Sequence, residues 1–237
     1  MNHGTKVVTL RIDGRDCGAR EDQTILEVAR ENGIKIPTLC HFKGLHPVGA
    51  CRICMVEVAG APRPLPACCT KAVEGMRVST ETPALHNSRR LIVEMMLSEG
   101  NHVCAVCVVN GHCELQELAL ALGVDHLEMP ALYPKREVDA SHPRFTLDRN
   151  RCVLCSRCVR ICGEIEGAHT WDIMGRGLGS AVISDLNQLW GEAESCTSCG
   201  KCVRACPTGA LFERGKAVGE GKATTRQHPG LRAGQLG

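Results

Sequence analysis

The sequence predicts an α+β chain that is divided into several small domains, and three observations lead to this prediction. The 237 residues exceed one typical domain. Their 17 cysteines fall into three blocks with different spacing. Strand-like and helical stretches both flank these blocks, and the third block is an internal repeat. We therefore expect domains at 1–83, 84–146 and 147–213, followed by a tail at 214–237.

The first domain is predicted to be a small mixed sheet crossed by one helix. The stretch "KVVTLRIDGRDCGAR" indicates a strand, an Asp-Gly turn and a second strand. The stretch "TILEVARENG" indicates a helix with Thr24 as N-cap, Glu27 at the capping-box position and Gly33 just past the end. "MVEVAG" and "MRVST" supply two more strands, and the domain is expected to end near Pro83.

The second domain is predicted to be helical. "SRRLIVEMMLSEG" has apolar residues at helical spacing, and "CELQELALALG" begins a second helix that stops at Gly123. The three cysteines of the second block lie between these helices. "MPALYPKREVDASHPRF" carries three prolines and is typical of a linker. After "GALFERG" the chain becomes Gly-rich and charged, which predicts a mobile or partner-docked tail.

The third block carries the strongest chemical signal. "CVLCSRCVRIC" and "CTSCGKCVRACP" both follow C-x2-C-x2-C-x3-C, the spacing of bacterial ferredoxins with two 4Fe–4S clusters. A tight loop with three cysteines can reach three corners of a cubane, so the fourth corner needs a thiolate from elsewhere. We therefore expect the fourth cysteine of each run to bind the other cluster. One predicted set is Cys152, Cys155, Cys158 and Cys206, and the other is Cys162, Cys196, Cys199 and Cys202. Two zinc sites are the alternative.

The first block is typical of a 2Fe–2S site. A long loop with closely spaced thiolates and a distant fourth ligand suits such a cluster beneath a sheet. The predicted ligands are Cys40, Cys51, Cys54 and Cys68. Cys69 could take the place of Cys68; we prefer Cys68, and expect Cys69 and Cys17 to be small apolar packing residues. A zinc site is again the alternative.

The second block offers three cysteines to a site that needs four ligands. Cys104, Cys107 and Cys113 are spaced C-x2-C-x5-C. His102 lies two residues upstream and is the natural fourth ligand, because imidazole can replace thiolate at an iron. His112 is adjacent to Cys113 and is expected to point elsewhere.

These three blocks, in this order, resemble the electron-input module shared by the largest peripheral-arm subunit of respiratory complex I, the N-terminal part of iron-only hydrogenases and NAD-linked formate dehydrogenases. The resemblance covers nearly the whole chain. It implies a β-grasp 2Fe–2S ferredoxin domain, a small helical His/Cys3 4Fe–4S domain and a bacterial-type two-4Fe–4S ferredoxin domain. The stretch "NHVCAVCVVNGHCELQ" and an end soon after the repeat resemble in particular the small diaphorase subunits (HoxU type) of soluble NAD-reducing nickel–iron hydrogenases.

One position departs from the related motif. Complex I and iron-only hydrogenases have His-x3-Cys-x2-Cys-x5-Cys, which would put the histidine at position 100. Here that position is Gly100, and the nearest histidine is His102. We expect His102 to serve as the ligand with this shortened spacing.

The resemblance implies an electron-transfer subunit without catalytic residues of its own. One 2Fe–2S and three 4Fe–4S clusters would relay electrons between a flavin- and NADH-binding diaphorase subunit and nickel–iron hydrogenase subunits, in a hetero-oligomer that couples oxidation of dihydrogen to reduction of NAD+. FMN, NAD and the Ni–Fe centre are expected on the partners only, since no dinucleotide fingerprint, P-loop or nucleophile constellation is visible. The alternatives are a relay subunit of a complex I-like NADH dehydrogenase or a formate dehydrogenase, a free-standing ferredoxin, and, in a different class, a zinc-binding structural scaffold.

Composition sets the remaining expectations. A net charge of +2 gives no argument for nucleic acid or an anionic membrane. No apolar run approaches the roughly 20 residues that span a bilayer, and the N-terminus lacks the features of a signal peptide, which predicts a cytoplasmic protein. The odd cysteine count argues against an all-disulfide scheme. Aromatic residues make up only 3%, so metal clusters are expected to fill much of the interior.

Overall fold

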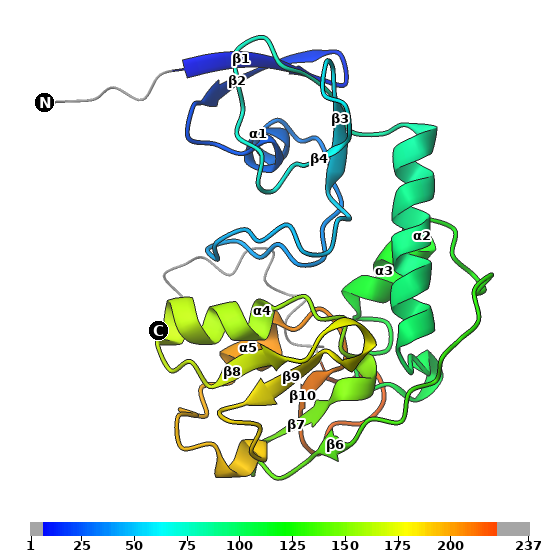
Figure 1. The fold of residues 1–237 in the computed structure, drawn as a ribbon, viewed down its shortest axis with the longest axis vertical. Helices are drawn as coiled ribbons and strands as arrows, with labels where there is room; N and C mark the ends of the chain where they lie inside the picture. Colours follow the sequence, from blue (N-terminus) through cyan, green and yellow to red (C-terminus); the bar gives the residue numbers. More distant parts are fainter. Residues whose placement is uncertain (1–6, 222–237) are drawn as a thin grey trace, which may run out of the picture. The chain divides into compact units, whose positions relative to one another are not determined.

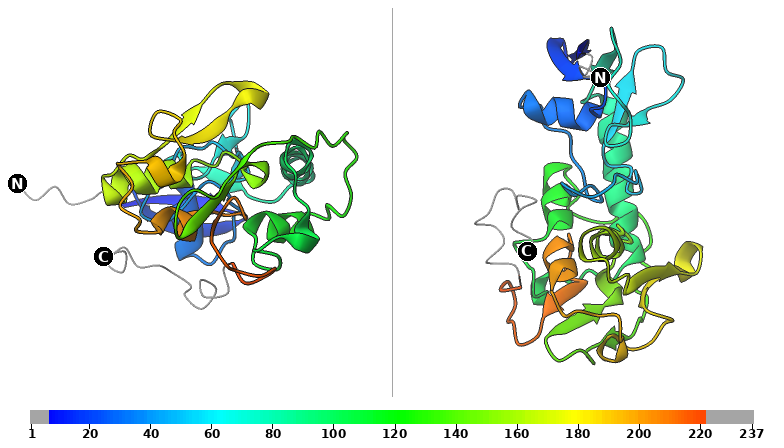
Figure 2. Two further views of the ribbon diagram at one scale, coloured as in Figure 1. Left: turned by 90° about the horizontal axis from the view of Figure 1, so that it is seen from below. Right: turned by 90° about the vertical axis from the view of Figure 1, so that its left-hand side faces the viewer.

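The computed structural model describes residues 7–221, and the chain forms two compact units (Figures 1 and 2). The first unit comprises Met1–His41 and Pro47–Ile92, and the second comprises Phe42–His46 and Val93–Gly237. The predicted domain at 147–213 and most of the one at 84–146 therefore lie together in the second unit.

The first unit contains a five-stranded mixed sheet, as predicted, in the order β2-β1-β5-β3-β4. β1 and β2 form an antiparallel hairpin whose turn residues Asp13 and Gly14 both have positive φ, the conformation that a two-residue turn of this kind requires. β5 is parallel to β1, and the other pairs are antiparallel. The strands are β1 (Val7–Ile12), β2 (Arg15–Arg20), β3 (Met55–Val58), β4 (Leu65–Pro66) and β5 (Arg77–Ser79). Only the two-residue β4 is absent from the prediction.

Helix α1 (Ile25–Glu31) has the predicted capping signals. The Thr24 hydroxyl accepts from the backbone N–H of Glu27, and the Glu27 carboxylate accepts from the backbone N–H of Thr24. Gly33 follows the helix with a φ of +70°. The buried face of α1 packs with the strands into one hydrophobic core (Figure 1). This face consists of Ile25, Leu26, Val28 and Ala29.

Helix α2 (Pro83–Glu99) begins at Pro83 rather than at Ser88. The Thr82 hydroxyl accepts from the backbone N–H of Leu85 at 3.2 Å, and proline is well suited to the first helical position. This Thr-Pro pair is therefore the true start signal. No helix among residues 7–221 has the length and apolar character needed to cross a bilayer.

Arg89 of α2 connects three segments of the first unit. Its side chain is 1% exposed and donates to the carbonyl oxygens of Ile53 (3.1 Å), Met55 (2.9 Å) and Thr80 (2.7 Å). An ion pair with the exposed Glu81 at 3.0 Å completes its contacts. Ile53 and Met55 flank a cysteine of the first block, so this arginine fixes the backbone on both sides of it.

Substitution of Arg89 by methionine is expected to destabilise the first unit by about 3 kcal/mol, because three buried carbonyl oxygens would lose their donor. The melting temperature of the protein, purified without oxygen, should fall by several degrees. Arg20→Met is the matched control, since Arg20 pairs with Asp22 on the surface, and it should leave the melting temperature nearly unchanged. Equal melting temperatures for both variants would contradict this role of Arg89.

The second unit is built from short helices, a three-stranded antiparallel sheet in the order β10-β7-β6 and the β8-β9 hairpin. The hairpin turns through the glycine-rich segment at 175–180. α4 and α5 contact each other (Figures 1 and 2). The elements are α3 (Glu114–Ala121), β6 (Val138–Asp139), β7 (Phe145–Asp148), α4 (Arg157–Arg160), β8 (Trp171–Met174), β9 (Ala181–Ser184), α5 (Lys201–Ala205) and β10 (Leu211–Glu213).

The segment predicted as a linker is packed at its C-terminal end, which corrects the prediction. β6 lies within this segment and pairs with β7. Asp139 is buried and accepts from the backbone N–H of Trp190 at 2.7 Å. His142 is also buried and stacks on Phe145, with ring centroids 4.9 Å apart. Prolines exclude a helix here, but they permit an edge strand, so the proline count alone is a poor sign of a free linker.

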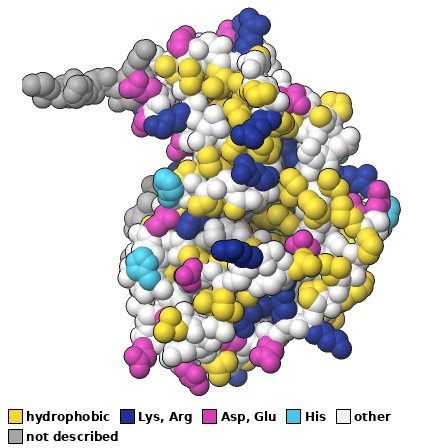
Figure 3. All heavy atoms as spheres, viewed as in Figure 1, with side chains coloured by type: hydrophobic (Ala, Val, Ile, Leu, Met, Phe, Trp, Pro, Cys, Tyr) yellow, Lys and Arg dark blue, Asp and Glu magenta, His cyan; other side chains and the backbone are white. Residues whose placement is uncertain are grey.

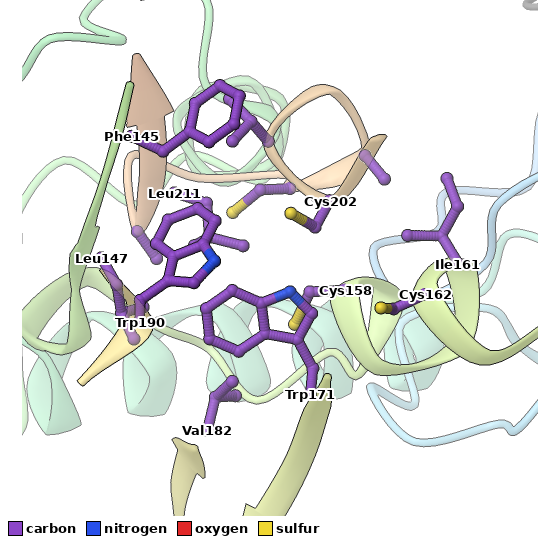
Figure 4. Close-up of a cluster of buried hydrophobic side chains, with 14 of the residues drawn as sticks. Phe145, Leu147, Cys158, Ile161, Cys162, Trp171, Val182, Trp190, Cys202 and Leu211 are labelled. Carbon is purple, nitrogen blue, oxygen red and sulfur yellow. The ribbon is translucent and has the colours of Figure 1, made fainter. Parts of the chain in front are cut away.

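The core of the second unit gathers most of the chain's few aromatic rings. Among two tryptophans, three phenylalanines and one tyrosine, both tryptophans and Phe145 are buried here, and Phe42 packs against them. Figure 4 shows the sulfurs of Cys158, Cys162 and Cys202 in the same space as Trp171 and Trp190. Cysteine side chains are thus part of this core.

The surface carries both signs of charge. On the face shown in Figure 3, basic and acidic side chains are interspersed, and hydrophobic side chains are exposed between them. The net charge of +2 means that basic and acidic residues are nearly equal in number, and the face in Figure 3 has no patch of a single sign.

Candidate metal centres

The four predicted ligands of the first block lie in two close pairs. The backbone N–H of Cys40 donates to the sulfur of Cys51, and the backbone N–H of Cys51 donates to the sulfur of Cys40, both at 3.4 Å. The sulfurs of Cys54 and Cys68 are 3.3 Å apart. All four side chains are buried. Two pairs of thiols suit a 2Fe–2S cluster, which takes four cysteine ligands on two irons.

Cys69 differs from its neighbour in burial. Cys68 is 1% exposed, whereas Cys69 is exposed, with its sulfur 3.5 Å from that of Cys68. The expectation that Cys69 is an apolar packing residue is therefore wrong, because its side chain faces outward from a tight turn. Cys17, in contrast, lies in the hydrophobic core as expected. The hydrogen bond from Cys68 lowers the pKa of Cys54 to about 7, so a thiolate is readily available in this group.

His102 of the second block has the state that a metal ligand needs. Its Nε2 atom is buried and has no hydrogen-bond partner among residues 7–221. Burial lowers the pKa of His102 to about 4, so the ring is neutral near pH 7, and a backbone hydrogen bond with Met96 holds it. His102 and Cys104 line the same pocket.

Gly100 explains the shortened spacing of the second block. A Cβ atom at this position would lie 2.3 Å from Nε2 of His102, because the imidazole ring folds back over the glycine. The ring of His102 therefore occupies the space where a side chain at position 100 would begin. Gly100 leaves room for the ring of His102, so the imidazole of His102 lies where the related motif has its histidine, at position 100.

The three cysteines of the second block are positioned by different elements. Cys104 begins a 3₁₀ turn (Cys104–Val106), and the backbone N–H of Cys107 donates to the carbonyl oxygen of Cys104 at 3.0 Å. Cys113 is the N-cap residue of α3 and is 7% exposed. His112 also has a buried ring nitrogen, Nδ1, without a partner among the described residues, so burial alone does not separate the two histidines.

Each of the two C-x2-C-x2-C loops winds through the left-handed region at equivalent positions. In the first loop Leu154 and Ser156 have φ of 52° and 56°, and in the second Ser198 and Gly200 have φ of 56° and 72°. Alternation between left- and right-handed residues turns successive backbone N–H groups toward one point, a concavity that binds anions and iron–sulfur clusters. The internal repeat in the sequence is thus a repeat in backbone conformation.

The structure brings the eight cysteines of the third block together in the two crossed sets that the sequence predicts. One cavity is walled by Cys152, Cys155, Cys158 and Cys206. A second cavity is walled by Cys162, Cys196, Cys199 and Cys202. Cys162 reaches the second cavity from a π-helical segment (Ile161–Glu166) that continues α4. We call the cavity with Cys152 the proximal cavity, because it lies beside the second block, and the cavity with Cys162 the distal cavity.

Burial makes four of these eight thiols hard to ionise without a metal. It raises the pKa of Cys152 to about 11 and the pKa values of Cys155 and Cys202 to about 12. It also raises the pKa of Cys158 well above its ordinary value. Buried thiolates need a bound cation, so these donor sets fit iron–sulfur clusters held by cysteine. Within residues 7–221, no three His, Cys, Asp or Glu side chains stand close enough to hold a single ion.

The second block lies directly against the proximal cavity. Arg157 makes a two-pronged ion pair with Glu114, with N–O distances of 2.7 and 2.8 Å. The backbone N–H of Glu114 donates to the carbonyl oxygen of Pro207 at 2.9 Å. The start of the predicted tail joins them, since the backbone N–H of Gly219 donates to the carbonyl oxygen of Cys107. The rest of that tail, from 222 onward, lies outside the described residues.

Gly209, three residues after Cys206, lies against the second block. A Cβ atom there would lie 2.7 Å from the sulfur of Cys107 and 3.1 Å from Val109. Gly209→Ala is expected to displace Cys107 and to reduce the iron content of the protein, because a sulfur that binds a metal cannot rotate away. Gly179→Ala is the matched control, since its Cβ atom would meet nothing within 4 Å. If Gly209→Ala kept its full iron content, Cys107 would be shown to accommodate the added methyl group without loss of metal.

Three family models match the chain in the predicted order. Residues 5–83 match a 2Fe–2S iron–sulfur cluster binding domain. Residues 89–128 match the iron–sulfur binding region of NADH-ubiquinone oxidoreductase-G, and residues 142–212 match the ferredoxin-like domain of NADH-quinone oxidoreductase subunit 3. The chain is therefore an α+β iron–sulfur protein of the electron-transferring oxidoreductase class.

Individual relatives define the family more closely. Subunit gamma of the NAD-reducing hydrogenase HoxS of Cupriavidus necator is 33% identical over 208 residues, which is 87% of each chain. A crystal structure of an NAD+-reducing [NiFe]-hydrogenase in the H2-reduced state contains a chain with 36% identity and a TM-score of 0.83, covering 89% of this chain and 88% of that one. The chain belongs to this family of HoxU-type hydrogenase subunits.

Longer proteins share the same region. The alpha subunit of the NADPH-Fe(3+) oxidoreductase of Geobacter sulfurreducens is 39% identical over 208 residues, which is 88% of this chain and 24% of that subunit. The chain thus spans about a quarter of the length of such relatives.

Proposed function

We propose that this chain is the electron-relay subunit of an NAD-reducing nickel–iron hydrogenase, with one 2Fe–2S and three 4Fe–4S clusters and no active site of its own. The observation that carries the proposal is the pair of cavities in the third block, each walled by four cysteines drawn from both runs. The family membership gives the assembly in which such a relay would work. Bound clusters would supply one-electron carriers between a flavin that takes hydride from NADH and a centre that activates dihydrogen.

The proposed ligands divide among four sites. Cys40, Cys51, Cys54 and Cys68 would hold the 2Fe–2S cluster, and His102, Cys104, Cys107 and Cys113 the His/Cys3 cluster. The two cavities of the third block would hold the remaining cubanes. The residues of the chain would bury the clusters and exclude water from them, and electrons would pass from the second block to the proximal and then to the distal cavity.

The exposed apolar residues around the β8-β9 hairpin support fixed protein partners. Leu186 is 92% exposed, Leu178 65% and Leu189 50%. Leu186 and Leu189 follow β9, whereas Leu178 lies in the turn at the other end of the hairpin, so a flavin subunit or a hydrogenase subunit would cover one end or the other. We place the complex in the cytoplasm, where thiols stay reduced.

A relay subunit of a complex I-like NADH dehydrogenase is the second candidate, and NAD-linked formate dehydrogenase is the third. The models matched by residues 89–128 and 142–212 take their names from NADH–quinone oxidoreductases, which favours the second. A zinc scaffold is the candidate from another class.

Metal analysis of the native complex tests these candidates. The complex would be purified without oxygen through a tag on this chain, and its iron, nickel, molybdenum, tungsten and zinc would be measured. Iron with nickel in the co-purifying subunits is the expected result. Iron with molybdenum or tungsten would indicate formate dehydrogenase, iron alone with quinone-reducing partners the complex I type, and zinc without iron would overturn the electron-transfer proposal.

A further inference from the structure

Both tryptophans of the chain lie at the distal cavity. Trp171 begins β8 and is 3% exposed, and Trp190 follows β9 and is 1% exposed. Their rings meet edge to face with centroids 4.7 Å apart (Figure 4). Both side chains line the distal cavity together with Phe145, which stacks on Trp190 at 5.4 Å. A chain with so few aromatic residues thus places its two largest at one site.

The two indole N–H groups are directed at cysteine sulfurs of that cavity. Nε1 of Trp190 donates to the sulfur of Cys196 at 3.2 Å. In Figure 4 the indole nitrogen of Trp171 lies on the side of its ring that faces the sulfur of Cys202. A buried indole N–H needs an acceptor, and here each one faces a sulfur rather than an oxygen.

The proximal cavity lacks this feature. Its walls are aliphatic apart from the cysteines, Ser156 and Thr208, and they include no aromatic residue. There the backbone N–H of Leu154 donates to the sulfur of Cys152 at 3.5 Å. Thr208 is 3.8 Å from the sulfur of Cys206 and gives its hydroxyl proton to the carbonyl oxygen of Arg151 instead. The two halves of the repeat therefore match in their cysteines and differ in their side-chain donors.

We propose that Trp171 and Trp190 raise the reduction potential of the distal cluster by donating hydrogen bonds to two of its thiolates. This inference rests on the proposed electron-relay function. A cubane with four thiolates is a dianion when oxidised and a trianion after it takes up one electron, so N–H donors stabilise the reduced state more than the oxidised state. Both indoles are positioning residues that act through the cysteine ligands, and the electron itself comes from the neighbouring carrier of the relay or from a chemical reductant.

Charged groups also lie near both cavities. At the distal cavity the carboxylate of Glu166 is paired with the ammonium group of Lys201 at 2.7 Å, and both side chains are largely buried, so this pair contributes little net charge. Arg144 donates to the carbonyl oxygen of Ser198 at 3.1 Å and is a further cation there. At the proximal cavity, Arg157 is paired with Glu114. The variants below leave all these groups in place, so a change in the distal midpoint would report the indole donors.

Trp→Phe substitutions in the native complex test the proposal, because phenylalanine keeps a buried ring and removes the N–H. The two single variants and the double variant would be purified without oxygen, and the iron content and the EPR-monitored midpoint of each cubane would be measured. Cys199→Ser identifies which signal belongs to the distal cluster. We expect the double variant to keep its iron and to show an about tenfold smaller equilibrium constant for reduction of that cluster, a shift of about 59 mV to lower potential, with the proximal midpoint unchanged.

Phe145→Leu is the matched control, since it changes the packing around Trp190 without removing an N–H that faces a sulfur. It should keep both midpoints. An unchanged distal midpoint in the double variant with full iron would overturn the inference, and so would an equal shift in Phe145→Leu. Loss of the distal cluster from each Trp→Phe variant, with Phe145→Leu intact, would make the indoles purely structural. Absence of iron from the unmodified protein would instead overturn the proposed function.

Discussion

Replacement of Cys162 by serine is expected to remove the distal cluster and to leave the proximal cluster of its own sequence run intact. Cys162 follows Cys158 in the chain, yet it lies on the wall of the other cavity, because the π-helical turn after α4 carries it there. The EPR spectrum of the reduced Cys162→Ser protein should therefore match that of Cys199→Ser and differ from that of Cys155→Ser. Iron content should fall by the iron of one cubane.

Cys69→Ser provides the control for that experiment. Cys69 is exposed and lies outside the proposed ligand sets, so this variant should keep all its iron and every EPR signal. A Cys162→Ser spectrum that matched Cys155→Ser would mean that each run binds its own cluster. The crossed ligation would then be wrong, although both cavities would still need an explanation.

Replacement of His102 by alanine is expected to remove the cluster of the second block and to interrupt electron transfer through the chain, by tenfold or more. The buried Nε2 atom has no other partner among the described residues, and alanine leaves the site with three ligands. His102→Cys should retain a cluster, at a lower reduction potential, because an anionic thiolate replaces a neutral imidazole. The measurements are the iron content and the rate of NADH-driven dye reduction by the complex.

His112→Ala is the matched control, since His112 also has a buried nitrogen without a partner in residues 7–221 and lies next to Cys113. It should retain the cluster. If His112→Ala lost the iron of this site and His102→Ala kept it, the ligand assignment would be reversed. Gly100→Ala should behave like His102→Ala, because its Cβ atom would occupy the place of the imidazole ring.

Much of the fold follows from local signals in the sequence. The capping box at Thr24 and Glu27 and the Asp-Gly turn after β1 each specify one conformation, and the structure shows them. The predicted start of α2 was too late, because it relied on the apolar periodicity that begins at Ser88. The Thr82-Pro83 pair, which contacts only the first turn, is the signal of the true start. The packed part of the linker was missed for another reason. Asp139 is buried by Trp190, which lies far along the chain, and no local pattern reports such a contact.

The cysteine spacing predicts more of the candidate site than of its surroundings. Spacing limits which sulfurs can meet, so the crossed grouping of the third block could be anticipated. The exposure of a side chain depends on the turn around it, so the outward position of Cys69 could not be anticipated from the spacing. Trp171 and Trp190 were not singled out as site residues. Their rarity in a sequence with 3% aromatic residues, and their place between the two cysteine runs, are the signals that could have drawn attention to them.

The crossed arrangement of the third block also has a consequence for biosynthesis. Cys152 and Cys206 wall one cavity, so the proximal site has all its ligands only after nearly the whole domain has left the ribosome. The distal site, to which Cys162 belongs, likewise lacks its other three cysteines until the second run has been synthesised. Under the proposed ligation neither cubane could be inserted into a nascent chain that stops between the runs, and the bound metal would have to offset the conformational entropy that closure of these long loops costs. Both centres would then form late in synthesis, and a ribosome that stalls before Cys206 would release a chain without a complete proximal site.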